Sequence, residues 1–192
     1  QQAAAICAIV GWYRMPNRQQ QVFRLFGYAG SGKSTITRYV IEELGLTPMS
    51  RHGNPNGGVL FAAFTGKAAL VMTRKGTLAS TIHSLIYSVI EATEEEVEAA
   101  EKKIEAARGE AHQLSGFDRT TAEATIEAMR QAVADMKRPR FALNPKSDAA
   151  HAKLIVLDEV SMVGEEMARD LMSFGKPILV LGDPGQLPPI QG

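Results

Sequence analysis

The stretch Gly27-Tyr-Ala-Gly-Ser-Gly-Lys33-Ser34 decides the fold of this 192-residue sequence. It directly follows an apolar run at 22–26 and directly precedes a helical stretch at 35–44. The glycines allow backbone amides to turn inward around phosphate oxygens, and the positive end of the following helix points at them. Lys33 can reach the β- and γ-phosphates of a nucleotide, and the Ser34 hydroxyl can ligate magnesium. The stretch therefore predicts a phosphate-binding loop between a strand and a helix.

Three more short apolar runs have the composition of buried parallel strands. They lie at 59–63, 154–157 and 178–181, and helical stretches separate them. This alternation predicts an α/β fold with a mainly parallel sheet and flanking helices. We also expect a helix at 2–14 and a surface loop in the Gly-, Asn- and Pro-rich segment 51–58.

Two carboxylates, Asp158 and Glu159, stand at the end of the run 154–157. An Asp at the tip of a buried strand can hold the magnesium shell, and the adjacent Glu can orient or deprotonate water. An Asp-Glu pair alone is most often a strand end meeting solvent. Combined with the phosphate-binding loop, the pair predicts the second half of an ATP hydrolysis site.

Gln186 lies in the Gly- and Pro-rich segment 182–189, directly after the fourth apolar run. It is the one long, neutral hydrogen-bonding side chain there. A Gln at a strand tip can sense a γ-phosphate or an attacking water. Taken alone, the segment is better interpreted as a Pro-rich surface turn.

Residues 91–138 interrupt the strand–helix alternation. Thr93 with Glu96, and Thr120 with Glu123, each fit a capping box that opens an Ala- and Glu-rich helix. With a turn at 114–118, these signals predict an inserted helical hairpin with arms at 93–113 and 120–137. The predicted organisation is one ATPase domain at 1–90 and 139–192, with the hairpin at 91–138. A solvated decoration is the alternative interpretation of the hairpin.

The zero net charge hides an uneven distribution. Residues 1–90 carry nine Lys/Arg and two Asp/Glu, a charge of +7, whereas residues 91–150 carry nine and thirteen, a charge of −4. The basic part could face a polyanion, although ordinary solvated faces would look the same. A single cysteine excludes a disulfide framework. The sequence contains no run of eighteen apolar residues, so no membrane-spanning helix is predicted. We expect a cytoplasmic protein without a signal peptide.

Five motifs in this order resemble those of superfamily 1 DNA helicases of the RecD type, the branch that includes phage Dda-like enzymes. The phosphate-binding loop, the run 157–162 and the segment 182–189 look like motifs I, II and III. Thr65-Gly-Lys-Ala-Ala69 resembles motif Ia, and Thr81-Ile-His-Ser84 resembles the short motif that follows it. The resemblance implies a RecA-like P-loop NTPase domain, the N-terminal motor domain of such a helicase.

The resemblance also implies roles for the matched positions. Lys33, Glu159 as base and Gln186 as γ-phosphate sensor would be catalytic, with Ser34 and Asp158 as Mg²⁺ ligands. Single-stranded DNA would be contacted by Thr65, Gly66, Lys67, Thr81 and His83. The ATP contacts would be Gly27, Ala29, Gly30, Ser31, Gly32, Lys33, Ser34, Thr35, Asp158, Gln186 and an adenine-reading glutamine, for which Gln2 fits better than Gln1.

Several features depart from the family pattern. Phe64 replaces the usual Pro of motif Ia, and a helical hairpin replaces the small pin subdomain, often a β-hairpin, that separates strands in relatives. Phe117, in the predicted turn, could stack on the first base pair of a duplex fork. The sequence stops before the second motor domain, so we expect this chain to bind nucleotide, hydrolyse it weakly and unwind nothing.

In a full-length protein the resemblance implies ATP-driven translocation on single-stranded DNA, 5′ to 3′, with duplex unwinding in repair, recombination or phage replication. Two other functions stay open. One is a kinase or other P-loop NTPase that never touches DNA, and the other is a nucleotide-gated module that binds a protein partner through 91–138.

Overall fold

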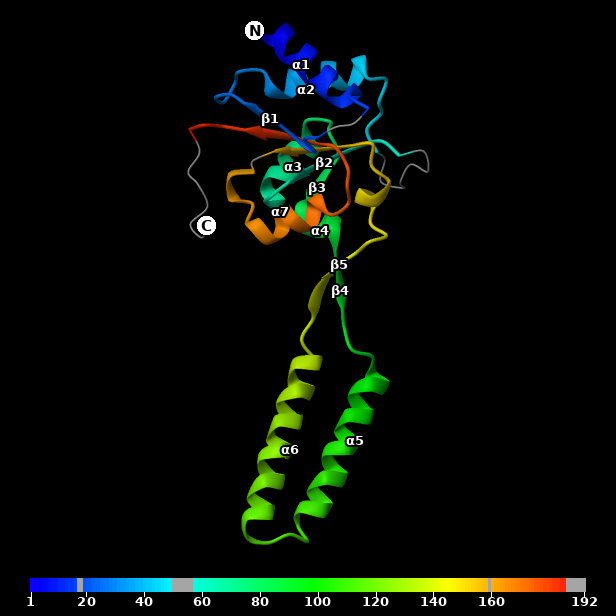
Figure 1. The fold of residues 1–192 in the computed structure, drawn as a ribbon, viewed down its shortest axis with the longest axis vertical. Coiled ribbons are helices and arrows are strands. Elements are labelled where there is room, and N and C mark those ends of the chain that lie inside the picture. The colour runs from blue at the N-terminus through cyan, green and yellow to red at the C-terminus, as the bar shows by residue number, and fades with distance from the viewer. Residues whose placement is uncertain (17–18, 50–56, 159, 186–192) are drawn as a thin grey trace. The chain divides into compact units, whose positions relative to one another are not determined.

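The computed structural model describes residues 1–16, 19–49, 57–158 and 160–185 and divides the chain into two compact units. The ATPase unit comprises Gln1–Tyr87 and Leu143–Gly192, and the hairpin unit comprises Ser88–Ala142 (Figure 1). The elements of the ATPase unit are α1 (Gln2–Arg14), β1 (Val22–Phe26), α2 (Lys33–Glu43), β2 (Val59–Ala63), α3 (Gly66–Arg74), β3 (Ala79–Thr81), α4 (Ile82–Ile86), η1 (Asp148–His151), β6 (Leu154–Asp158), η2 (Val160–Met162), α7 (Glu165–Met172) and β7 (Ile178–Gly182).

The ATPase unit is built on a five-stranded sheet in the order β1-β7-β6-β2-β3, and the four strand pairs are parallel. The α/β fold with a mainly parallel sheet is confirmed, and the four predicted strands are present. The strand β3 is not among the predicted strands, because its three residues, Ala-Ser-Thr, form no apolar run. Parallel pairing places the carboxyl ends of all five strands along one edge of the sheet.

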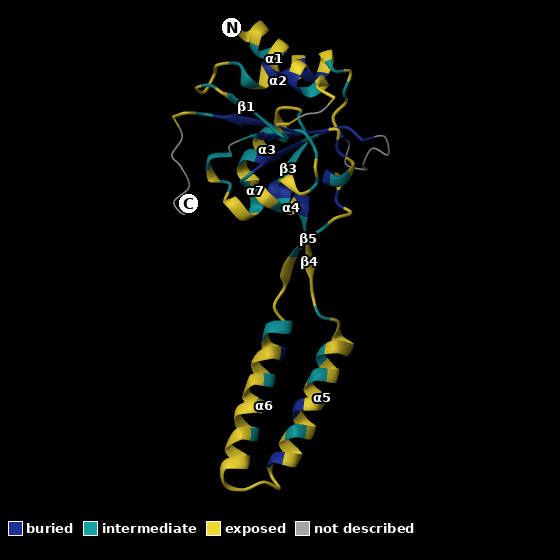
Figure 2. Cartoon of the chain, viewed as in Figure 1, coloured by how far each residue is buried: buried dark blue, intermediate teal, exposed yellow. Residues whose placement is uncertain are grey.

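The core consists of two layers, one on each face of this sheet. Side chains alternate between faces along a strand, so Leu154 and Val156 join the layer of α1 and α2, whereas Ile155 and Leu157 join the layer of α4 and α7. Burial on both faces explains the continuous apolar sequence of β6 and β7, which lie in the buried centre of the unit (Figure 2).

The hairpin unit contains α5 (Glu94–Ala111) and α6 (Gly116–Met136), preceded and followed by the paired strands β4 (Tyr87–Ile90) and β5 (Arg140–Leu143). The inserted helical hairpin is therefore confirmed. Its core residues recur every three or four positions, which is the spacing of one helix face: Val97, Ala100, Ile104, Ala107 and Ala111 on α5, and Ala122, Ile126, Met129 and Val133 on α6. The unit extends to 88 and 142, beyond the predicted 91–138, because the added residues form β4 and β5.

One end of the hairpin was predicted correctly and the other was not. The capping box of Thr93 and Glu96 is present, with both of its hydrogen bonds. The second box is wrong and the predicted turn at 114–118 extends too far, because α6 begins at Gly116 and the Thr120 hydroxyl donates to the Gly116 carbonyl. Leu114 and Ser115 do lie between the two helices. Asp118 favours helix in the first turn, where its charge meets the positive helix end. Phe117 thus lies in that first turn.

Candidate nucleotide-binding site

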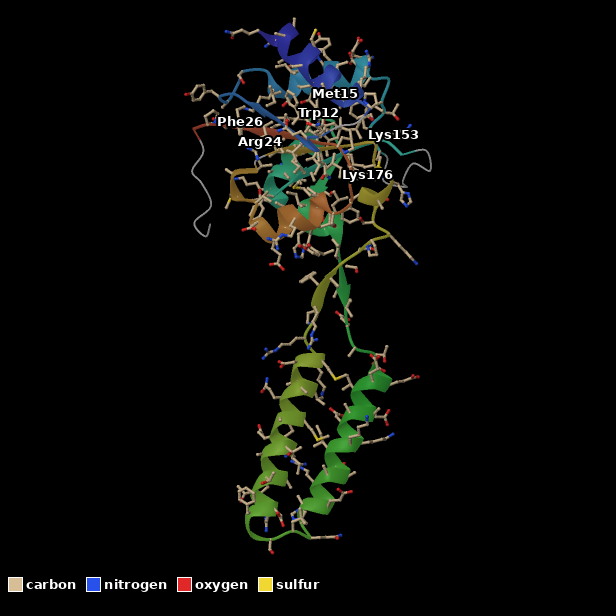
Figure 3. The ribbon with its side chains drawn as sticks, viewed as in Figure 1. Trp12, Met15, Arg24, Phe26, Lys153 and Lys176 are labelled. Carbon is tan, nitrogen blue, oxygen red and sulfur yellow. The ribbon has the colours of Figure 1, made fainter. Side chains whose placement is uncertain are left out.

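The phosphate-binding loop connects β1 to α2. Gly30 and Gly32 have φ values of 76° and 90°, which favour glycine over residues with a side chain. The Gly27 N–H donates to the Gly182 carbonyl over 3.1 Å, which joins the loop to the end of β7. The ring of Phe26, labelled in Figure 3, occupies the space that a side chain at Gly182 would need. Glycine at 182 therefore permits β7 to end directly beside the loop.

Lys33 is held by the loop itself. Its Nζ donates to the Gly27 carbonyl and, over 3.1 Å, to the Tyr28 carbonyl. Both partners are neutral acceptors, so a phosphate could exchange them for a stronger, charge-assisted bond. Ala29, Gly30, Ser31, Ser34 and Thr35 are exposed around it. The loop thus combines an available cation with the exposed N-terminus of α2.

Gln2 contacts this loop from α1. Its Nε2 donates to the Ser31 carbonyl over 3.4 Å and would lie 2.7 Å from a Cβ placed on Gly32. Gln2 is the first residue of α1, in agreement with the predicted helix at 2–14, and Gln1 is the N-cap residue. Of the two candidate glutamines, Gln2 is the one in contact with the loop.

The remaining nucleotide-site candidates come from the ends of the central strands. Asp158 ends β6, which is separated from β1 by β7 alone, a distance of about 10 Å at normal strand spacing. Ser34 and Asp158 offer hydroxyl and carboxylate oxygens, the ligand type that suits Mg²⁺ alongside nucleotide phosphates. The Asp183 side chain accepts from the Gly185 N–H over 2.9 Å. Glu159 and Gln186 lie outside the described residues.

A second group of candidates lies at the ends of β2 and β3. Thr65 accepts from the Ala68 N–H over 3.2 Å and caps α3, and Thr81 accepts from the Ser84 N–H over 3.0 Å and caps α4. A Cβ placed on Gly66 would lie 4.0 Å from the Thr81 methyl group, so the two helix starts are neighbours. Lys67 is exposed on α3.

The two threonines therefore have local structural roles that the sequence prediction did not include. The Thr81 hydroxyl is also 2.8 Å from the Ser84 hydroxyl, to which it donates. His83 is half-buried on α4, and its ring lies 4.9 Å from that of Tyr87. The Tyr87 contact had no signal in the sequence, because it depends on how α4 packs.

A model of the AAA domain family matches residues 15–191. The chain belongs to this family. The expected P-loop domain of the superfamily 1 helicase type is thereby confirmed, and such a domain binds nucleotide. No curated protein matches the sequence.

Among solved structures, the AAA domain is similar to a Pif1 helicase from Bacteroides, crystallised as a double mutant. The match has 20% identity and a TM-score of 0.49, and it covers 97% of this chain and 33% of that one. The AAA domain thus spans about a third of the length of that helicase chain.

None of the described helices combines the length and apolar character that crossing a membrane requires.

Proposed function

We propose that this AAA domain is the first motor domain of a superfamily 1 DNA helicase, in which ATP hydrolysis drives movement along single-stranded DNA. The observation that supports the proposal is that the five motifs follow five strands whose carboxyl ends share one edge of the sheet. Motifs I, III and II follow the adjacent strands β1, β7 and β6, and the two DNA motifs follow β2 and β3. The nucleotide half and the DNA half thus share the continuous row of strand ends where α/β sheets bind ligands.

In the nucleotide half, Lys33 would leave the Gly27 and Tyr28 carbonyls for the β- and γ-phosphates. Ser34 and Asp158 would hold Mg²⁺, which neutralises phosphate charge when it is bound. Gln2 would read adenine from beside the loop, Glu159 would act as base, and Gln186 would couple the γ-phosphate to the DNA half. ATP is the substrate that this set of roles requires.

In the DNA half, Lys67 would contact the backbone phosphates as an exposed point charge. Thr65 and Thr81 would act through the helix starts that they cap, where free N–H groups suit phosphate oxygens. Gly66 would allow close approach of the strand, and His83 would contact it from α4. Translocation 5′ to 3′ in a full-length protein with a second motor domain is part of the proposal, as are repair, recombination or phage replication as its setting.

The hairpin unit is proposed to act as a pin at the duplex fork. Phe117 supports this role because it is 84% exposed in the first turn of α6. It is not among the residues that form the hairpin core. Exposed aromatic rings can stack on bases, which contributes about 1–3 kcal/mol per base. The twelve carboxylates of the unit limit DNA contact to its tip.

Two lysine variants test the division into two halves. Lys33→Ala should weaken binding of a fluorescent ATP analogue about 10- to 100-fold, the loss of charge-assisted hydrogen bonds, and leave binding of a labelled oligothymidine unchanged. Lys67→Ala should weaken binding of the oligothymidine and leave binding of the ATP analogue unchanged. It should also lower the salt dependence of oligonucleotide binding by about one counterion. Lys146→Ala is the matched control, since Lys146 is also exposed in the ATPase unit. Nucleotide binding without any oligonucleotide binding would favour an NTPase that does not act on DNA.

A further inference from the structure

A hydrogen bond between Tyr87 and Asp170 joins two distant parts of the ATPase unit. The Tyr87 hydroxyl donates to Asp170 Oδ2 over 2.5 Å, across 83 positions of sequence. Both residues are half-buried, Tyr87 directly after α4 and Asp170 on α7. Burial, the bond to Asp170 and the charges of Asp170 and Glu166 raise the pKa of Tyr87 to about 12. The hydroxyl therefore keeps the proton that it donates at neutral pH.

Tyr87 also contacts His83, four residues earlier. Positions four apart lie on one face of a helix, and the two rings are 4.9 Å apart at an interplanar angle of 53°. The Tyr87 N–H additionally donates to the His83 carbonyl and closes α4. A helix of five residues is too short to be stable alone, so its side-chain contacts determine where His83 lies.

We propose that Tyr87 and Asp170 are positioning residues that hold the His83 imidazole in place for contact with single-stranded DNA. Asp170 fixes the phenol, the phenol ring restricts the imidazole, and α7 thereby supports the DNA half of the site. A side chain ordered before binding loses less freedom when the strand arrives. The inference rests on the proposed function, since it needs His83 to meet DNA.

The chain offers variants that separate this role from ordinary packing. Tyr87→Phe removes the hydroxyl and keeps the ring, and Asp170→Ala removes the acceptor. Asp170→Asn keeps one acceptor oxygen, which a rotation of the side-chain amide brings to the Tyr87 hydroxyl. Tyr13→Phe is the matched control, because the Tyr13 hydroxyl also donates across the unit, to the Lys153 carbonyl over 3.2 Å. The measurements are affinity for a labelled oligothymidine, affinity for a fluorescent ATP analogue, and the free energy of unfolding.

We expect Tyr87→Phe and Asp170→Ala to weaken oligonucleotide binding about threefold to tenfold, the size of one hydrogen bond. Asp170→Asn should restore most of the loss, and Tyr13→Phe should cause none. ATP-analogue affinity should not change in any of them. In a His83→Gln background, Tyr87→Phe should have no further effect on oligonucleotide binding, because coupled residues are not additive.

Four results would overturn the inference. Unchanged oligonucleotide binding in Tyr87→Phe would remove the positioning role while leaving the proposed function intact. An undiminished effect of Tyr87→Phe without His83, or a parallel loss of nucleotide affinity, would show a general packing role instead. No oligonucleotide binding by the unmutated chain would sink the proposed function itself, and Tyr87 would then have no DNA contact to position.

Discussion

The ATPase unit and the hairpin unit use their charges in opposite ways. Of eight Lys/Arg at 88–142, five form ion pairs with carboxylates of the same unit: Lys102–Glu98, Arg119–Glu123, Arg130–Glu127, Lys137–Glu101 and Arg138–Asp135. Of eleven described Lys/Arg in the ATPase unit, only Arg14 and Arg169 form such pairs within the described residues. The hairpin pairs most of its cations with its own carboxylates, whereas most described cations of the ATPase unit form no ion pair within the described residues.

The two units also differ in how their cores are filled. The ATPase core has two layers of large side chains, including Leu154, Ile155, Ile178 and Leu179, all of them 1% exposed or less. The hairpin core is a single seam that relies on alanine at several positions and has no residue below 6% exposure. The free energy of unfolding of the chain should therefore depend mainly on the ATPase core. Local opening of the hairpin should require less free energy.

The largest expected effect comes from cutting a side chain out of the ATPase core. Leu179→Ala should lower the free energy of unfolding by about 2–5 kcal/mol, because a fully buried side chain leaves a cavity between close-packed strands. Urea denaturation followed by Trp12 fluorescence measures this directly, since Trp12 is the one tryptophan and lies in α1.

Ile126→Ala is the hairpin counterpart of that variant. In this variant, the helix signal in circular dichroism should be lost at lower urea concentrations than in the unmutated chain. The unfolding transition followed by Trp12 fluorescence and the affinity for the ATP analogue should not change. A shift of the Trp12 midpoint in Ile126→Ala as large as that in Leu179→Ala would show that the two units unfold as one, contrary to the comparison.

A smaller effect distinguishes the true helix cap of the hairpin from the mispredicted one. Thr93→Ala should destabilise the hairpin by about 0.5–2 kcal/mol, because it removes the side-chain acceptor for the Glu96 N–H. Thr120→Ala should stabilise it by about 0.5 kcal/mol, since alanine is the better helix former inside α6. Thermal melts followed by circular dichroism at 222 nm would distinguish the two variants. Equal destabilisation by both variants would show that Thr120 also caps a helix.

The smallest expected effect concerns the ion pairs themselves. Glu101→Gln breaks a 2.8 Å pair with Lys137 that links α5 to α6, with both side chains about half exposed. The loss should be about 0.2–1 kcal/mol at low salt and should vanish at about 1 M salt, where exposed charges are screened. A loss that persists at high salt would mean that the pair contributes packing as well as charge.

The phosphate-binding loop and the central strands were predictable from sequence because local patterns encode them. A glycine-rich loop with Lys33, between an apolar strand and a helix, is a pattern of consecutive residues and can be found without knowing its distant partners. The same holds for β2, β6 and β7, whose burial on both faces requires uninterrupted apolar residues. Their predicted bounds agree with the structure to within one residue.

The features that sequence analysis missed depend on contacts between distant segments. The three-residue strand β3 exists because β2 offers it a parallel partner, and its own composition gives no strand signal. The start of α6 was misplaced because Thr120 and Glu123 match a cap pattern that a longer helix overrides. Glu159 and Gln186, two predicted catalytic residues, lie outside the described residues and stay predictions.

By itself, the sequence determined the α/β class, the phosphate-binding loop and the order of five motifs, because glycine placement and apolar periodicity act over a few residues. Only the tertiary structure decided that Gln2 is the glutamine beside the loop, that Thr65 and Thr81 cap neighbouring helices, and that Tyr87 reaches Asp170. These contacts join residues on different elements, and their partners are chosen by how the elements pack against one sheet. Packing is a property of the whole chain, so no local pattern reports it.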